Sequence, residues 1–167
     1  FPYTTLFRSC FFFAANTGMR RGEVMALKWQ SIDFDQRTIN VLEAWKKKRE
    51  TKGEPKWGSV RSLPMTKALS QKLMEFKGDA HNTDPDDYVF CNVDGTPLGN
   101  TWWLKNFDGT LKRLGIDKKG RNLKPHSFRH TLNTFLIGRG EDPMLVRQLT
   151  GWRNVSTQLR YTHLQAE

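Results

Sequence analysis

The chain has 167 residues and a formal net charge of +10, because 27 lysines and arginines face 17 aspartates and glutamates. A hydrophobic content of 37% indicates a folded domain and excludes a disordered chain. No apolar run is long enough to cross a bilayer, and the positive charge favours a polyanionic partner, nucleic acid before a membrane surface.

The first nine residues read as the in-frame translation of a common sequencing adapter. We interpret residues 1–9 as an artefact of the DNA read, at which the true gene is cut, and expect the domain to occupy residues 10–167. A clean re-read of the source DNA that places these codons inside a longer open frame would refute this interpretation.

The first half of the chain predicts one short helix followed by antiparallel strands. From Arg21 the spacing of Val24, Leu27 and Trp29 predicts a helix with one apolar face. After a polar turn at 31–37, residues 38–42 alternate as a strand does, and residues 60–64 are expected to be the returning strand. Between them, the strongly basic segment 45–57 contains a glycine and a proline and reads as a hairpin tip or long loop.

The second half of the chain is predicted to be mostly helical. Helical spacing marks five segments, at residues 66–77, 101–114, 125–139, 142–151 and 156–164. Thr66 is a candidate N-cap, Gly115 a candidate helix end, and residues 88–90 a short strand. The predicted fold class is therefore mainly α with a small antiparallel β-sheet.

A histidine and arginine cluster opens the helix expected at 125–139. Arg129 and His130 follow His126 by three and four residues, so the three side chains share one helix face. An arginine near a helix N-terminus can grip a phosphate through two parallel hydrogen bonds. The alternative is that the two histidines are a partly buried structural pair.

Metal binding is the other alternative for the histidine pair. Histidines four residues apart can ligate a metal, but Ser127 stands where the zinc-protease helix needs a glutamate. Cys10 and Cys91 have no metal-binding spacing and indicate free thiols in a reducing, cytoplasmic compartment. We therefore predict no metal site.

A second arginine stands far earlier in the chain. Arg20 lies three residues before Glu23, which is close enough on one helical turn to orient it. Arg–Glu pairs at this spacing usually lie on the solvent-exposed face of a helix. Together with Arg129, however, Arg20 could surround one phosphate and stabilise the charge that develops in phosphoryl transfer.

Tyr161 is the candidate nucleophile. A phenol has a pKa near ~10 and is a poor nucleophile at neutral pH unless cations or a base assist it. Two arginines and a histidine would supply that help. The other two tyrosines, Tyr3 and Tyr88, have no such neighbours in the sequence.

These pieces resemble, in order and spacing, the tyrosine recombinase family in its phage-integrase branch, over nearly all of the chain after Ser9. The resemblance rests on five runs, at residues 17–23, 56–64, 126–130, 151–152 and 159–163. It implies a catalytic domain that cuts and rejoins double-stranded DNA as a site-specific recombinase, without metal or nucleotide cofactor. It also implies a tetramer on DNA for the full-length protein.

The resemblance assigns the site residues. Tyr161 would form a 3′-phosphotyrosine, Arg20 and Arg129 would stabilise the phosphorane, and Lys56 would protonate the leaving 5′-oxygen, with Lys52 as its competitor. Four more residues would assist: His126 in proton transfer or phosphate positioning, Trp152 by a hydrogen bond to a phosphate oxygen, and Glu23 and His130 as supports. Backbone phosphates would be bound by Lys46, Lys47, Lys48, Arg49, Lys52 and Arg61.

The sequence departs from the family pattern at both ends. The family's helical DNA-clamping domain and a longer C-terminal tail are missing, so we expect this chain alone to bind DNA weakly and assemble poorly. Three alternatives to the recombinase remain: an enzyme like a type IB topoisomerase, a non-catalytic DNA-binding relic, and a metal-dependent hydrolase built on the histidines.

Overall fold

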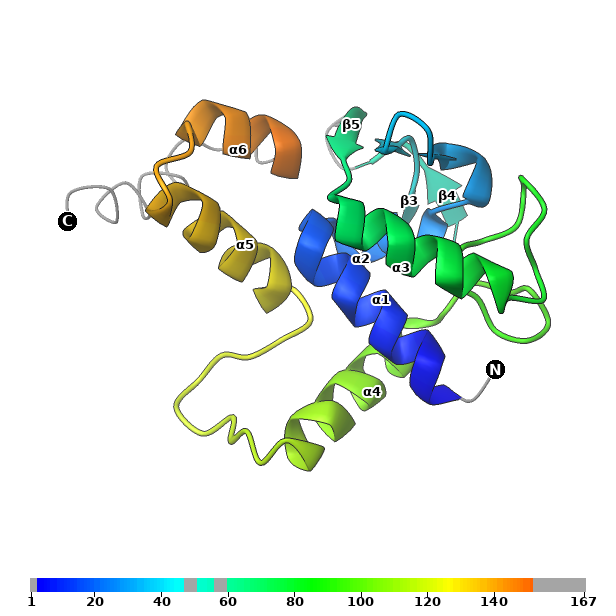
Figure 1. Cartoon of the computed structure of the whole chain (residues 1–167). Helices are drawn as coiled ribbons and strands as arrows, with labels where there is room; N and C mark the ends of the chain where they lie inside the picture. The colour runs from blue at the N-terminus through cyan, green and yellow to red at the C-terminus, as the bar shows by residue number, and fades with distance from the viewer. Residues whose placement is uncertain (1–2, 47–50, 56–59, 152–167) are drawn as a thin grey trace.

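A computed structural model of the chain describes residues 3–46, 51–55 and 60–151. Helix α1 (Tyr3–Thr17) lies at the centre of the molecule, with α3 (Lys67–Gly78), α4 (Asn100–Arg113) and α5 (Ser127–Gly138) around it (Figure 1). The short helix α2 (Arg21–Ala26) follows α1 after a tight turn, and α6 (Pro143–Thr150) packs on α5. The predicted class, mainly helical with a small antiparallel sheet, is confirmed.

Two small antiparallel sheets lie on one side of α1. The first has the order β1-β2-β5, made of Ile32–Asp33, Thr38–Val41 and Arg61–Pro64. The second is the hairpin of β3 (Ala44–Lys46) and β4 (Thr51–Gly53). The strands predicted near 38–42 and 60–64 are thus confirmed, with Val41 paired to Arg61 in the register. Part of the basic segment 45–57, predicted to be a hairpin tip or loop, is itself paired as β3 and β4.

An aromatic cluster around α1 forms much of the core. The ring of Phe11 lies 5.5 Å from that of Trp103 on α4 and 5.6 Å from that of Phe128 on α5, between centroids. Phe7, within the segment interpreted as an artefact, is also buried, and its ring centroid lies 6.1 Å from that of Phe11. The structure therefore continues α1 through residues 3–9. The interpretation of their origin stays a prediction.

Several predicted helix ends are confirmed by their caps. The hydroxyl of Thr66 accepts from the Leu69 amide at 3.1 Å, and α4 is followed by Gly115 at a φ of 65°. Asp142 caps α6 by accepting from the Met144 amide at 2.8 Å.

Three sequence predictions were wrong in detail. The helix that begins at Arg21 ends at Ala26, so Leu27 and Trp29 lie beyond it. Residues 88–90 form no strand in the described chain, because Tyr88 makes only an isolated bridge to Lys28. The helix expected from Pro125 begins at Ser127, because the Ser127 amide donates to the Lys124 carbonyl at 2.8 Å and closes a turn there.

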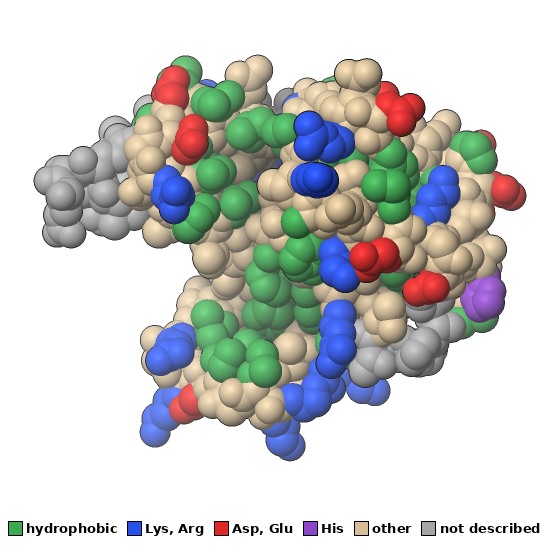
Figure 2. Space-filling model, viewed as in Figure 1, with side chains coloured by type: hydrophobic (Ala, Val, Ile, Leu, Met, Phe, Trp, Pro, Cys, Tyr) green, Lys and Arg blue, Asp and Glu red, His purple; other side chains and the backbone are tan. Residues whose placement is uncertain are grey.

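Exposed basic side chains gather over α4 and the loop that follows it, at the lower edge of the view in Figure 2. The members that are exposed are Lys105, Lys112, Arg113, Lys118, Lys119, Arg121 and Lys124. Among the helices of residues 3–46, 51–55 and 60–151, none has the length and apolar character needed to cross a membrane.

Candidate functional site

The turn between α1 and α2 places Arg20 and Glu23 together. Gly18 has a φ of 59°, which lets the chain reverse directly after α1. Glu23, at the third position of α2, reaches back and accepts from the Arg20 amide at 2.8 Å and from Arg20 Nη1 at 2.8 Å. The Glu23 side chain is only 1% exposed, whereas that of Arg20 is 21% exposed. The predicted orientation of Arg20 by Glu23 is therefore present.

Arg61 joins this pair from β5. Its Nη2 and Nη1 lie 2.9 Å and 3.2 Å from the two carboxylate oxygens of Glu23, in a two-pronged ion pair. Its Nε donates to the carbonyl oxygen of Leu149, near the end of α6, at 2.7 Å. The Arg61 side chain is 7% exposed, so it lies inside the protein rather than on the surface where a phosphate contact was predicted.

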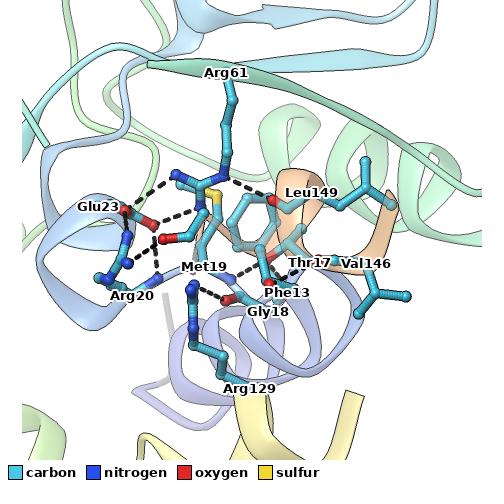
Figure 3. A network of polar contacts seen from close by, with 12 residues as sticks. Phe13, Thr17, Gly18, Met19, Arg20, Glu23, Arg61, Arg129, Val146 and Leu149 are labelled. Carbon is cyan, nitrogen blue, oxygen red and sulfur yellow. Dashed lines mark hydrogen bonds and ion pairs between the residues drawn. The ribbon is translucent and has the colours of Figure 1, made fainter. Parts of the chain in front are cut away.

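The end of α6 closes against both guanidinium groups (Figure 3). Gly151 has a φ of 65°, and its carbonyl oxygen accepts a hydrogen bond from Arg20 Nη2. A Cβ on Gly151 would lie 3.1 Å from Arg61 Nη1 and 3.4 Å from Arg20 Nη1. The missing side chain of Gly151 therefore allows two arginines to approach its backbone.

Arg129 reaches the same region from α5. Its side chain is buried, and its Nη1 donates to the carbonyl oxygen of Gly18 at 2.9 Å (Figure 3). Burial and the positive charges of Arg20 and Arg61 together lower the pKa of Arg129 to about 9, against the opposing effect of Glu23. A pKa of about 9 still leaves Arg129 cationic at neutral pH.

Three arginines thus surround one carboxylate. Arg20, Arg61 and Arg129 come from different parts of the chain. The carboxylate of Glu23 is hydrogen-bonded to Arg20 and Arg61, and its charge acts on Arg129. The cluster keeps an excess of positive charge after Glu23 is paired. Such an arrangement can bind an anion and stabilise negative charge that develops on it.

The two histidines lie beside this cluster. His126 is the residue that precedes α5, and its ring centroid lies 4.9 Å from that of His130, with the planes at 88°. Desolvation lowers the pKa of His126 to about 4, helped by the charges of His130, Arg129 and Arg20, although part of the residue is exposed. His126 is therefore neutral at pH 7.

The structure brings together Arg20, Glu23, His126, Arg129 and His130 of the predicted site residues. Lys46 is exposed at the end of β3. Lys52 lies in β4, where its backbone pairs with that of Trp45 in β3. The remaining predicted residues, Lys47, Lys48, Arg49, Lys56, Trp152 and Tyr161, lie outside the described residues.

Sequence reasoning missed the contributions of Arg61, Leu149 and Gly151 to the arginine cluster. The sequence did contain one indication of the direction of Arg61. In a β-strand every second side chain faces the same side of the sheet. Leu63 is buried, so Arg61, two residues before it, also points inward.

Comparison with known proteins identifies the family to which the chain is similar. The sequence model of the phage integrase family matches residues 3–167. A XerC-like tyrosine recombinase of Caldanaerobacter subterraneus is 29% identical over 181 residues, covering 94% of this chain and 45% of that protein. The tyrosine recombinase XerD of Halalkalibacterium halodurans is 30% identical over 152 residues, covering 89% and 46%. The chain spans about half the length of these curated relatives.

Solved structures share the fold. The Tn1549 transposon integrase in complex with a circular intermediate DNA superposes with a TM-score of 0.79 at 22% identity, covering 92% of this chain and 52% of that one. The XerA recombinase superposes with a TM-score of 0.72 at 25% identity, covering 96% and 53%.

Proposed function

The chain belongs to the phage integrase family, and we propose on that premise that it is the catalytic part of a site-specific DNA recombinase. The enzyme would cut and rejoin strands of double-stranded DNA through a covalent tyrosine intermediate, in the cytoplasm. Support comes from the relatives, which are named as tyrosine recombinases, and from the neighbour that was solved with DNA. We assign the catalytic domain to residues 10–167.

The observation that carries the proposal is the meeting of Arg20 and Arg129 beside Glu23. Arg20 leads into α2, and Arg129 lies on α5, yet the charge of Arg20 is close enough to lower the pKa of Arg129. A phosphodiester bound between them would gain hydrogen bonds from two guanidinium groups that are already held in place. The pentacoordinate phosphorane carries more negative charge than the diester, so the cluster would favour it over the ground state.

The proposed reaction is a transesterification. The hydroxyl oxygen of Tyr161 attacks the phosphorus atom, a P–O bond to tyrosine forms, and the bond from phosphorus to the 5′-oxygen breaks. Lys56, or Lys52 in its place, gives a proton to that oxygen, which leaves as a 5′-hydroxyl. The 3′-phosphotyrosine keeps the energy of a phosphodiester, so a 5′-hydroxyl of another strand can reverse the step and exchange strands.

His126 is suited to receive the tyrosine proton or to position the phosphate. Because its pKa is about 4, the ring is neutral at pH 7 and has one nitrogen that accepts and one that donates. Trp152 would donate its indole N–H to a phosphate oxygen. His130 would support His126, and Lys46, Lys47, Lys48, Arg49 and Lys52 would contact backbone phosphates.

A trapping assay tests this proposal. The protein and a Tyr161→Phe control are incubated, in chelator, with a pool of labelled nicked duplexes whose cleaved strand loses its short end. A band shifted on a denaturing gel only with Tyr161 supports the covalent mechanism. Cleavage of the duplexes that is lost when chelator is added would favour a metal-dependent hydrolase. If this chain and its full-length gene product both give no band, the DNA-binding relic replaces the enzyme.

Two further assays separate the recombinase from its alternatives. Relaxation of supercoiled DNA without any recombinant product would favour an enzyme like a topoisomerase. For the full-length protein we propose a tetramer on DNA, and for this chain alone weak binding and poor assembly. A stable DNA-bound tetramer formed by this chain alone would overturn the second expectation.

A further inference from the structure

We infer that Arg61 is a positioning residue, which holds the Glu23 carboxylate and the end of α6 in the geometry that Arg20 needs to bind the scissile phosphate. This inference rests on the proposed function. It gives Arg61 a role inside the site instead of the contact with backbone phosphates that a basic residue beside a basic hairpin first suggests.

The first support is the direction and burial of the Arg61 side chain. It enters the protein from β5 on the same face as the buried Leu63, and it is 7% exposed. A residue that contacts the DNA backbone must present its guanidinium at the surface. The Arg61 guanidinium instead donates to protein acceptors: Nη1 and Nη2 to the carboxylate of Glu23, and Nε to the Leu149 carbonyl.

The second support is that Glu23 is shared. Its Oε1 accepts from Arg20 Nη1 at 2.8 Å and from Arg61 Nη1 at 3.2 Å, and its Oε2 accepts from the Arg20 amide at 2.8 Å and from Arg61 Nη2 at 2.9 Å. A carboxylate held at both oxygens by the fork of Arg61 cannot rotate away from Arg20. The orientation of Arg20 therefore depends on Arg61 through Glu23.

The third support lies at the end of α6. Arg61 Nε holds the Leu149 carbonyl at 2.7 Å, while Arg20 Nη2 holds the Gly151 carbonyl two residues later. The backbone of Gly151 lies directly against both guanidinium groups, since an added Cβ would stand 3.2 Å from Arg61 Cζ. Arg61 thus fixes the backbone immediately before Trp152 and the segment that carries Tyr161 in the sequence.

Lysine cannot replace these contacts. It keeps the positive charge, but its single ammonium group cannot span both oxygens of Glu23 and also reach the Leu149 carbonyl in the fixed directions of a guanidinium. Arg61→Lys therefore separates the effect of geometry from the effect of charge. Arg37→Lys is the matched control. It makes the same chemical change at an exposed residue, in the turn between β1 and β2.

The experiment measures the single-turnover rate of covalent complex formation at saturating protein, and the Kd for the same nicked duplexes at several salt concentrations. We expect Arg61→Lys to lower the saturating rate by roughly tenfold to a hundredfold, as small misplacements of catalytic groups do. The Kd should stay within about threefold of the wild-type value. Its salt dependence should not change, because Arg61 contacts no backbone phosphate and so displaces no counterion from the DNA. Arg37→Lys should leave the rate and the Kd unchanged.

A double variant tests whether Arg61 acts through Glu23. If it does, the protein that carries both Glu23→Gln and Arg61→Lys should react about as slowly as the slower single variant. The reason is that both changes disrupt the same Arg61–Glu23 ion pair. All variants are compared at a temperature at which circular dichroism shows them folded, and Arg61→Gln serves as a second variant if Arg61→Lys does not fold.

Three results would overturn the inference. A weaker Kd with a salt slope reduced by about one, at an unchanged saturating rate, would make Arg61 a phosphate contact. A lower melting temperature with unchanged rate and Kd would make its role purely structural. Rate losses that multiply in the double variant would show that Arg61 acts independently of Glu23. The proposed function fails separately, when the wild-type chain and its full-length gene product form no adduct that depends on Tyr161.

Discussion

The guanidinium of Arg20 donates to the carbonyl oxygen of Gly151, 131 positions later in the chain. This contact joins the turn after α1 to the end of α6, and so connects the two parts of the sequence that carry the first arginine and the tyrosine. The conformation of Gly151 is what makes the contact sterically possible, because its φ of 65° and its missing side chain leave room for Arg20 and Arg61.

Replacing Gly151 with alanine should therefore destabilise the protein. The positive φ costs about 1 kcal/mol for a residue with a Cβ. The Cβ would also push the Arg61 guanidinium by a few tenths of an ångström. Gly109→Ala is the control: Gly109 lies inside α4, where the nearest atom to an added Cβ is 3.8 Å away. We expect the control to be stabilised by about 0.5–1 kcal/mol. Urea unfolding measures both, and equal effects of the two changes would contradict the explanation.

How far the sequence predicts this site depends on the kind of contact. The Arg20–Glu23 pair is local, so helical spacing alone predicts it. The placement of His126 was predicted less well, because the Lys124–Ser127 turn leaves His126 just outside α5. The strand expected at 88–90 fails for a tertiary reason: Val89 and Phe90 are buried against other elements, and the Val89 amide donates to the Leu27 carbonyl.

The role of Arg61 needed the tertiary structure. Its position beside a basic segment favours a surface contact, and only the pairing of β5 with β2 and the approach of α6 show that it enters the arginine cluster. The spacing of two residues between Arg61 and the apolar Leu63, which puts both on one face of a strand, was the one usable sequence signal.

Glu23 should contribute to stability above acidic pH. Burial alone would raise the pKa of Glu23, but the hydrogen bonds and charges of Arg61 and Arg20 outweigh it and leave the pKa below the usual value. The stabilisation is therefore present above the unfolded pKa of about 4.3 and is lost as the pH falls through the lower folded pKa.

Glu23→Ala should cost about 3 kcal/mol or more at pH 7, because it leaves buried guanidinium groups without their carboxylate. The variant should also lose less stability than the wild type when the pH is lowered to about 3. Urea midpoints at the two pH values measure both effects. A variant with the same acid sensitivity as the wild type would show that Glu23 is not held as a paired carboxylate.

His126 should make the folded protein less stable as the pH falls from about 6.5 to about 4. The folded pKa of His126 is about 4, below the unfolded value of about 6.5, so in this window the unfolded state binds the additional proton. His126→Gln should flatten the dependence of stability on pH between those values. An NMR titration should assign a midpoint near 4 to the His126 ring, and a midpoint at or above 6.5 would refute the lowered pKa.

Arg129→Lys should reduce catalysis more than binding. A lysine keeps a charge but loses the planar donors, so we expect the rate of covalent complex formation at saturating protein to fall by roughly 10²–10³-fold. The Kd for DNA should change much less, because Arg129 is buried and contributes little to nonspecific backbone contacts. A variant that reacts at the wild-type rate would remove Arg129 from the proposed phosphate site.

The most direct test of the central proposal is the mass of the peptide that becomes linked to DNA. The trapped adduct is digested with nuclease and trypsin, and cleavage after Arg160 releases residues 161–167. We predict that this peptide carries a nucleotide attached through a 3′-phosphate to Tyr161, and that Tyr161→Phe abolishes the adduct. A nucleotide attached to any other residue, or no adduct from either this chain or its full-length gene product, would contradict Tyr161 as the nucleophile served by Arg20 and Arg129.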